Sequence, residues 1–295
     1  MNHAFIILAH TQPALLNRIL SRLKASNHFF FINIDKKACY DEFSPILRDN
    51  NVSYISNLCV YHGGFSMITV TLHLLEAVAK SKVKIDYVHL ISGQDYPVVS
   101  NEEFDDRFER ADGYSFMWYD RDDEHARWIV PGGIYEKRYR WWCFSREDIK
   151  ISFLRWFVAK FDSCSHRFLI RKRIEGIRAG WQWFSWHISV VCFVLNYLND
   201  NQEYLRRFRH TCCTDELIFH TLLYPHLERL KIHKSDALRY IDWYPKRQYT
   251  GKLPLVLEEV DYDDIINSKA LLCRKVDSKK SSKLLDMLDR AAIIF

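Results

Sequence analysis

The sequence has no apolar run that approaches the roughly 18 residues needed for a membrane-spanning helix. Its start also lacks the basic region and the length of a secretory signal peptide. None of its eight cysteines stands in a CxxC pair, which argues against a disulfide framework or a zinc site. Apolar surroundings such as those of Cys192 predict buried free thiols in a reducing compartment. These absences predict a cytoplasmic protein.

Several nucleotide and metal motifs are missing as well. There is no GxGxxG and no P-loop, so a dinucleotide-dependent oxidoreductase or a P-loop kinase loses its main support. The histidines at 62, 166, 187, 220 and 226 show neither HxH nor HExxH spacing, which also argues against zinc. A net charge of +5 suits a phosphate-bearing ligand but is too small to indicate nucleic acid, and no nucleic-acid-binding module is present.

Strand and helix patterns alternate in the first 112 residues. The expected strands are 4–9, 28–34, 52–55 and 87–92. One expected helix has Pro13 in its first turn, and another starts near Ser66. This alternation predicts βαβ units that form a mostly parallel sheet, with ligands bound at the carboxyl ends of its strands. His10, Asp35 and Asp95 follow such strand ends.

The remainder of the chain shows no repeat, low-complexity tract or linker. Further helices are expected at 187–198 and 215–223, and the last 50 or so residues contain a short strand and two helices. We therefore predict a single α/β domain over residues 1–295. Its nucleotide-binding part would be 1–112, and its acceptor-binding and catalytic part would be 113–295.

An acidic pair opens an apolar helical run at residues 211–219. Thr214 can cap this helix and place Asp215 and Glu216 in its first turn, where the helix dipole favours negative charge. A carboxylate on a rigid element suits a general base that takes a proton from a sugar hydroxyl. An ordinary helix start produces the same pattern far more often, so the pair gains meaning only from other motifs.

A bound diphosphate needs positive charge from a metal or from side chains. Asp120 and Asp122 form an acidic D-x-D of the kind that holds a divalent ion, although their mixed-charge surroundings favour a solvated loop. The candidate cations lie in the C-terminal third: Lys246, Arg247, Lys252, Arg274 and Lys275. A solvated basic surface is the alternative interpretation of these cations.

Aromatic residues make up 15% of the chain, including nine Trp and sixteen Tyr. Such a content is typical of proteins that stack on sugars or lie near membranes, and a large aromatic core explains most of it equally well. Trp243, which follows the segment 239–242, is the candidate for an apolar sugar platform, with core packing as the equal alternative.

Eight short motifs, in this order along nearly the whole chain, are similar to a known family. They are 5–10 (FIILAH), 32–35 (INID), 63–66 (GGFS), 90–97 (LISGQDYP), 180–184 (GWQWF), 214–216 (TDE), 239–243 (RYIDW) and 272–277 (LCRKVD). Together they resemble the core-2/I-branching β-1,6-N-acetylglucosaminyltransferases, a family that also includes the peptide O-xylosyltransferases.

The resemblance implies a GT-A-like, Rossmann-like α/β fold and inverting, metal-independent transfer of GlcNAc, xylose or another hexose from a UDP-sugar to a glycan hydroxyl. It implies Glu216 as the catalytic base. The implied donor-binding residues are His10, Asp35, Asp95, Arg274, Lys275 and either Lys252 or Arg247. The implied acceptor-binding residues are Trp243, Arg138 and Trp183. No cofactor besides the donor substrate is expected.

This sequence departs from the animal members of the family, which are Golgi proteins with a membrane anchor and disulfides. It starts directly at the first strand and is similar to a short bacterial cytosolic member. We therefore expect a surface-polysaccharide or lipid-linked glycan acceptor. Tyr61 and His62 replace the tryptophan expected before the glycine pair, which puts donor selectivity in question.

The stretch 153–173 interleaves aromatic and basic residues, a pattern typical of a helix that lies at the inner face of a membrane. An amphipathic helix packed on the core explains this pattern about as well.

Two alternatives to the interpretation as a metal-independent glycosyltransferase remain. One is a metal-dependent transferase that uses Asp120 and Asp122, and the other is a non-catalytic glycan-binding protein on the same fold. The presence of Glu216 argues against the second.

Overall fold

The computed structural model describes residues 1–50, 52–120, 150–154, 156–157, 174–249 and 251–294. Arg138, Asp122 and residues 158–173 lie outside the described residues, as do Cys143 and Cys164. The predicted acceptor contact of Arg138 and the D-x-D partner Asp122 therefore stay predictions without a structural description.

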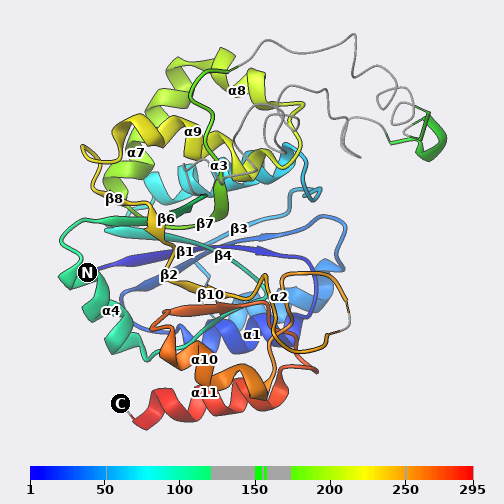
Figure 1. Cartoon of the computed structure of the whole chain (residues 1–295), viewed down its shortest axis with the longest axis vertical. Helices are drawn as coiled ribbons and strands as arrows, with labels where there is room; N and C mark the ends of the chain where they lie inside the picture. Colours follow the sequence, from blue (N-terminus) through cyan, green and yellow to red (C-terminus); the bar gives the residue numbers. More distant parts are fainter. Residues whose placement is uncertain (51, 121–149, 155, 158–173, 250, 295) are drawn as a thin grey trace.

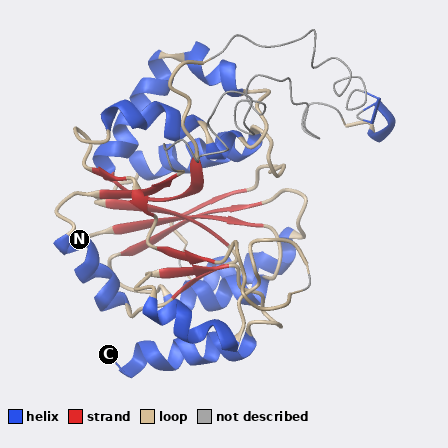
Figure 2. Cartoon of the chain, in the orientation of Figure 1, coloured by secondary structure: helices blue, strands red, loops and turns tan. Residues whose placement is uncertain are grey.

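A twisted sheet runs through the middle of the molecule (Figures 1 and 2). In the described part of the chain it has eight strands in the order β3-β2-β1-β4-β7-β6-β8, with β9 also paired to β6. The strands are β1 (His3–Ala9), β2 (His28–Ile34), β3 (Tyr54–Ser56), β4 (Tyr87–Ser92), β6 (Ser115–Tyr119), β7 (Gly180–His187), β8 (Ile232–His233) and β9 (Ser235–Asp236). Strands β3, β2, β1 and β4 are mutually parallel, which confirms the predicted α/β fold with a mostly parallel sheet.

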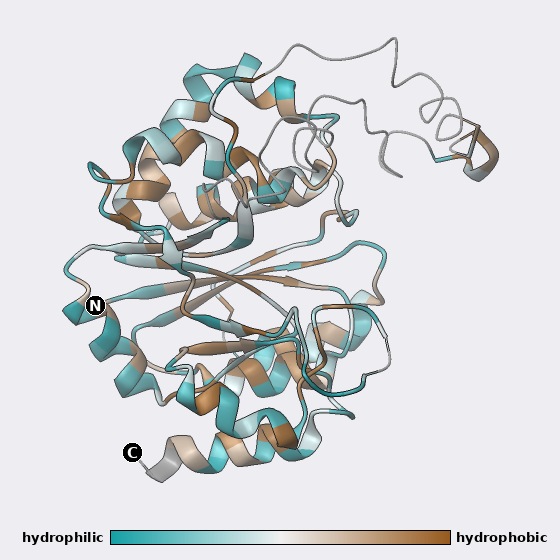
Figure 3. Cartoon of the chain, viewed as in Figure 1, coloured by the Kyte–Doolittle hydropathy of each residue, from teal (hydrophilic) through white to brown (hydrophobic). Residues whose placement is uncertain are grey.

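Helices cover both faces of this sheet (Figure 1). One face carries α3 (Ser66–Ala79), α7 (Ile188–Asp200), α8 (Gln202–Phe208) and α9 (Ile218–Leu223). The other carries α1 (Pro13–Arg22), α2 (Tyr40–Asp49), α10 (Tyr262–Asn267) and α11 (Ser282–Ile294). Each face buries its own apolar cluster, and α4 (Asn101–Arg110) completes the second one with Phe104 and Phe108. Figure 3 shows the central strands as largely hydrophobic and α4 as largely hydrophilic.

A smaller sheet joins the C-terminal part to the end of β4. Among the described residues it has three strands, β10 (Arg239–Ile241), β11 (Leu272–Arg274) and β5 (Asp95–Pro97). The antiparallel register places Arg274 opposite Asp95. Two motifs that are far apart in sequence therefore meet at the carboxyl end of β4.

The acidic pair does not lie where the capping pattern predicts. Residues Thr214–Glu216 form a separate 3₁₀ turn, η1, and the α-helix begins only at Ile218. The hydroxyl of Thr214 donates to the carbonyl oxygens of Thr211 (2.7 Å) and Phe208 (3.1 Å). The N-cap of the α-helix is Leu217, which has no side-chain cap hydrogen bond, so the prediction of Thr214 as N-cap is wrong.

The thiol prediction is correct for one cysteine and wrong for others. Six described cysteines are free, and Cys273 is buried. Cys192, however, is exposed on α7, because the buried face of that helix consists of Val190, Val191, Val194 and Leu198.

The strand Gly180–His187 and the helices α2, α4 and α8 have no counterpart in the sequence predictions. No helix among the described residues has the length and apolar character needed to cross a bilayer.

Candidate active site

The first part of the site lies where β1 and β2 end. The backbone N–H of Asp35 donates to the carbonyl oxygen of Ala9 over 2.8 Å, which brings the residues after the two strands together. The Asp35 side chain is nearly buried and pairs with the Lys37 ammonium, Nζ to Oδ2, at 2.7 Å. Lys37 also donates to the Val60 carbonyl and lies 4.3 Å from the centre of the Tyr61 ring.

The imidazole of His10 connects this edge to the C-terminal motif. Burial lowers the pKa of His10 below its ordinary value, and the positive charges of Lys275 and Lys37 lower it further, while Asp35 raises it. Asp35 and Lys275 thus both lie within electrostatic reach of His10, and the donor-binding role of the three residues stays a prediction. A neutral imidazole both donates and accepts a hydrogen bond, which suits contact with the nucleobase or the ribose of a nucleotide.

Arg274 is held from two sides at the end of β11. Its Nη1 lies 2.8 Å from Asp95 Oδ2 and 3.0 Å from Ser92 Oγ, and its guanidinium carbon lies 4.0 Å from the centre of the Trp183 ring. Asp95 has no exposed surface and also faces Arg239 Nε at 3.6 Å. Burial lowers the pKa of Arg239 to about 10, still far above neutrality. The buried carboxylate of Asp95 thus orients two arginines.

Lys275 is fixed by its backbone. Its N–H donates to the Leu255 carbonyl at 3.3 Å, and its own carbonyl accepts from the Leu257 N–H at 2.9 Å. Burial and the adjacent Arg274 lower the pKa of Lys275, while Asp277 raises it. Arg274 and Lys275 are thus adjacent cations on a backbone segment that is held by hydrogen bonds. Together they create a positive potential suited to a diphosphate.

Arg247 and Lys252 differ in their surroundings. Arg247 Nη2 pairs with Asp261 at 3.0 Å and lies 3.6 Å from Glu258, whereas the side chain of Lys252 is exposed. A cavity of about 460 Å³ beside Arg247 is lined by Tyr240, Asp242, Tyr244, Lys246, Arg247, Val260, Asp261 and Asp264. Neither Glu216 nor Lys275 lines this cavity.

Glu216 is positioned by the turn before it. Its N–H donates to the Cys213 carbonyl at 3.1 Å, and the Cys213 N–H donates to the Gly63 carbonyl at 3.0 Å. The turn η1 packs against β7, which carries Trp183, and against α3. The glycine-pair loop, Trp183 and the acidic turn thus belong to one packed region.

The other predicted residues contribute less. Trp243 is half-buried after β10, and its indole N–H has no hydrogen-bond partner among the described residues. Asp120 is half-buried directly after β6, and its N–H donates to the Ala179 carbonyl at 2.9 Å, whereas Asp122 lies outside the described residues. Neither Arg239 nor Lys37 was predicted as a site residue, although Arg239 lies inside one of the eight motifs. Only their proximity to Asp95 and Asp35 marks them as part of the site.

Comparison with known proteins identifies the family. Residues 3–265 match the sequence profile of the Core-2/I-Branching enzyme family. The chain belongs to this family. The matched range includes Glu216, Arg247 and Lys252, whereas Arg274 and Lys275 lie beyond it.

Two curated relatives agree with this membership. Xylosyltransferase oxt of Drosophila pseudoobscura pseudoobscura is 24% identical over 70% of this chain and 22% of its own length. Beta-1,3-galactosyl-O-glycosyl-glycoprotein beta-1,6-N-acetylglucosaminyltransferase 4 of Danio rerio is 25% identical over 39% of this chain and 28% of its own length. This family member therefore matches only about a quarter of the length of each.

A solved structure of mouse xyloside xylosyltransferase 1 in its apo form covers 92% of this chain and 97% of its own. Its sequence identity is 10% and its TM-score 0.37, which is too low to support an argument.

Proposed function

We propose that this member of the core-2/I-branching family is an inverting, metal-independent glycosyltransferase. It transfers a sugar, GlcNAc or xylose before other hexoses, from a UDP-sugar to a hydroxyl of a glycan acceptor. The main support is that His10, at the end of β1, lies within electrostatic reach of both Asp35, at the end of β2, and Lys275, beside β11. Fixed cations at the carboxyl edge of a parallel sheet are where a nucleotide diphosphate is expected.

In the proposed reaction Glu216 removes the proton from the acceptor hydroxyl. The resulting oxygen forms a bond to the anomeric carbon while the bond to UDP breaks on the opposite side. The electron pair of the broken bond leaves with UDP, and Lys275 and Arg274 stabilise the developing negative charge of the diphosphate. An α-linked donor therefore gives a β-linked product.

Asp95 acts in this proposal by positioning Arg274, because its carboxylate is fully buried against that guanidinium. Trp183 is 9% exposed, and the Arg274 guanidinium covers its ring. We therefore propose that Trp183 holds this guanidinium in place rather than binding the acceptor. The exposed Lys252 is the better second cation, since Arg247 is already paired with Asp261.

The acceptor is proposed to be a lipid-linked or surface-polysaccharide glycan, bound by Trp243 and Arg138, at the inner face of a membrane. The described part of the 153–173 stretch supports this docking, because Phe153, Trp156 and Phe157 are each more than half exposed. Aromatic side chains beside basic residues favour the interfacial region of a bilayer.

The experiment is calorimetric titration of UDP and a set of UDP-sugars, first in excess EDTA and then with Mn²⁺. Binding in EDTA supports a diphosphate held by side chains, and the tightest UDP-sugar identifies the donor. Binding that requires Mn²⁺ contradicts metal independence and supports the alternative site at Asp120 and Asp122. UDP-sugar binding without turnover on any glycan would instead support a glycan-binding protein.

A further inference from the structure

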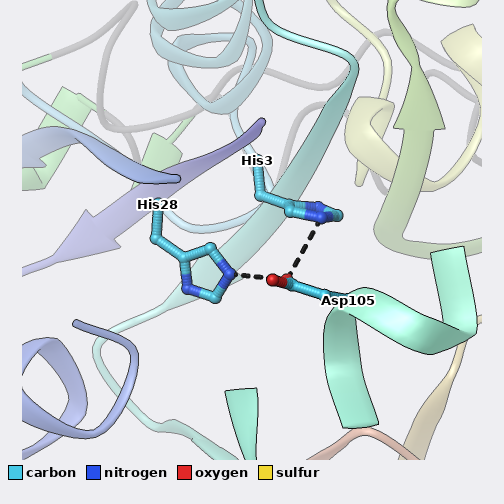
Figure 4. A group of neighbouring side chains, drawn as sticks. All are labelled: His3, His28 and Asp105. Atoms are coloured by element: carbon cyan, nitrogen blue, oxygen red, sulfur yellow. Dashed lines mark hydrogen bonds and ion pairs between the residues drawn. The ribbon is translucent and has the colours of Figure 1, made fainter. Parts of the chain in front are cut away.

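Three side chains with metal-ligand chemistry meet at the edge of the sheet opposite to the candidate active site. His3 is the first residue of β1 and His28 is the first residue of β2, and the parallel register places them side by side. Asp105 reaches the same point from α4 (Figure 4). Because both strands run away from this edge, the cluster is separated from His10 and Asp35 by the length of the strands.

The geometry is that of a small coordination site. His28 Nε2 lies 2.9 Å from Asp105 Oδ1, and His3 Nε2 lies 3.3 Å from the same oxygen. One ligand atom from each of the three residues lies within 4.8 Å of the others. Zinc-to-nitrogen and zinc-to-oxygen bonds of about 2.0–2.2 Å imply ligand separations of roughly 3.3–3.6 Å in a tetrahedron. The distance of 3.3 Å between His3 Nε2 and Asp105 Oδ1 lies within that range.

The hydrogen bond that His28 Nδ1 makes leaves a lone pair on Nε2, the second ring nitrogen. Nδ1 lies 2.7 Å from the Leu23 carbonyl oxygen, which only accepts, so Nδ1 must carry the proton. A neutral ring then turns the lone pair of Nε2 toward the Asp105 carboxylate, acceptor against acceptor. A cation between the two, either a second proton or a metal ion, resolves this contact.

His3 provides an independent indication. Both imidazoles have fully buried side chains, and His3 Nε2 has no hydrogen-bond partner among the described residues. In the tautomer whose Nδ1–H donates to His89 Nε2, at 3.0 Å, the Nε2 of His3 presents a lone pair. Neutral imidazole is the form that binds a metal.

Outer hydrogen bonds orient all three residues. His3 Nδ1 lies 3.0 Å from His89 Nε2, and His89 Nδ1 lies 3.0 Å from Ser185 Oγ. Asn27 Nδ2 donates to the second oxygen of Asp105 at 2.7 Å. Metal-binding histidines and carboxylates have such outer partners almost always.

We propose that His3, His28 and Asp105 bind one divalent transition-metal ion of the zinc class, with a structural role. Two imidazole nitrogens and one carboxylate oxygen suit Zn²⁺ and, in the test tube, Co²⁺. The ion would tie β1 and β2 to α4. The Asp105 side chain is 26% exposed, so a water can complete the coordination from the solvent side.

The test uses the untagged full chain, stripped of metal and titrated with Zn²⁺ against a chromophoric chelator. One ion per chain is expected, together with a higher melting temperature in Zn²⁺. Asp105→Asn should lose this site, and Asn27→Ala should bind about 10–100-fold more weakly because it removes an outer partner. His233→Gln, at an exposed histidine on β8, is the matched control and should behave as the parent.

Co²⁺ loading of the parent protein gives a second readout that needs no variant. Visible d–d bands of four- or five-coordinate Co²⁺ are expected, and they should be displaced by one equivalent of Zn²⁺. Absence of a stoichiometric site in the parent would overturn the proposal and leave the cluster as a buried ion pair. Equal affinity of Asp105→Asn and the parent would overturn it as well.

Discussion

The backbone N–H of Cys213 donates a hydrogen bond to the carbonyl oxygen of Gly63 over 3.0 Å. Gly63 has a φ of +70°, a conformation that favours glycine, and it belongs to the loop before α3. Cys213 begins the turn that ends at Glu216. The bond therefore fixes the proposed catalytic base to the loop that also carries Tyr61, the aromatic ring against Lys37.

Replacing the proposed base should separate chemistry from binding. In Glu216→Gln the side chain keeps its size but cannot take a proton, so kcat should fall by about 10²–10⁴-fold. Calorimetry should show unchanged UDP affinity. Glu203→Gln, at an exposed glutamate on α8, is the control and should retain full turnover. Retained turnover in Glu216→Gln would remove Glu216 from the role of base.

The diphosphate cations can be ranked by three alanine variants. Lys275→Ala should weaken UDP binding by about 10–100-fold, because a hydrogen bond to a charged group contributes about 1.5–3 kcal/mol. Lys252→Ala should weaken UDP binding without changing stability, since its side chain is exposed. Arg247→Ala should instead lower the free energy of unfolding, because it leaves Asp261 without its ion pair. Unchanged UDP affinity in Lys275→Ala would contradict the proposed site.

Gly180 should tolerate no side chain. A Cβ at this position would lie 2.0 Å from the Trp118 carbonyl oxygen and 2.6 Å from His220 Nε2. Gly180→Ala should therefore lower the free energy of unfolding by about 1–3 kcal/mol or more, measured by chemical denaturation. Gly113→Ala is the comparison: it has φ +79° but open space around it, so it should cost about 1 kcal/mol. A smaller loss in Gly180→Ala than in Gly113→Ala would contradict this packing.

Acid should destabilise the protein partly through His220. Burial lowers the pKa of this imidazole to about 3 in the folded state, from an ordinary value of 6.5. The unfolded chain therefore takes up a proton first, so the stability from neutral His220 is complete above pH 6.5. It declines as the pH falls from there toward 3, by at most about 1.4 kcal/mol per pH unit.

His220→Gln tests this pH dependence, since an amide can still donate to the Trp118 carbonyl that His220 Nε2 contacts at 3.0 Å. Denaturation curves between pH 6.5 and 4 should show a shallower loss of stability in the variant. Identical slopes in the variant and the parent would mean that His220 does not contribute.

Membrane docking can be tested by flotation with anionic liposomes. Replacing Phe153, Trp156 and Phe157 by serine should reduce flotation, because these exposed rings would enter the interface. A double variant with Val260→Ser and Ile266→Ser removes exposed apolar surface elsewhere and is the control. Unchanged flotation of the triple variant, or no flotation of the parent, would contradict docking through this segment.

Local patterns were sufficient for the parallel half of the sheet. The apolar runs at 28–34 and 87–92 are β2 and β4 with the predicted bounds, and Pro13 lies in the first turn of α1 as predicted. The motif positions of His10, Asp35 and Lys275 also come from the sequence, and the structure brings them within electrostatic reach. Whether these residues bind a UDP-sugar stays a prediction.

Other features depend on partners that are distant along the chain. The strand Gly180–His187 lies between β4 and β6 and is antiparallel to both. The local pattern of apolar residues does not predict which strands it pairs with. Cys213, the residue before the 3₁₀ turn at Glu216, likewise bonds to Gly63, 150 positions earlier in the chain.

The sequence by itself determined the strand-helix alternation, the family and the residues that carry the proposed chemistry, because each is encoded in a few neighbouring positions. Only the tertiary structure decided that Asp95 orients Arg274 and that His3 and His28 meet Asp105. Asp105 is 77 positions from His28, and the pairing of parallel strands and the docking of α4 close that separation. Such contacts depend on how buried surfaces pack across the whole chain, which local spacing does not encode.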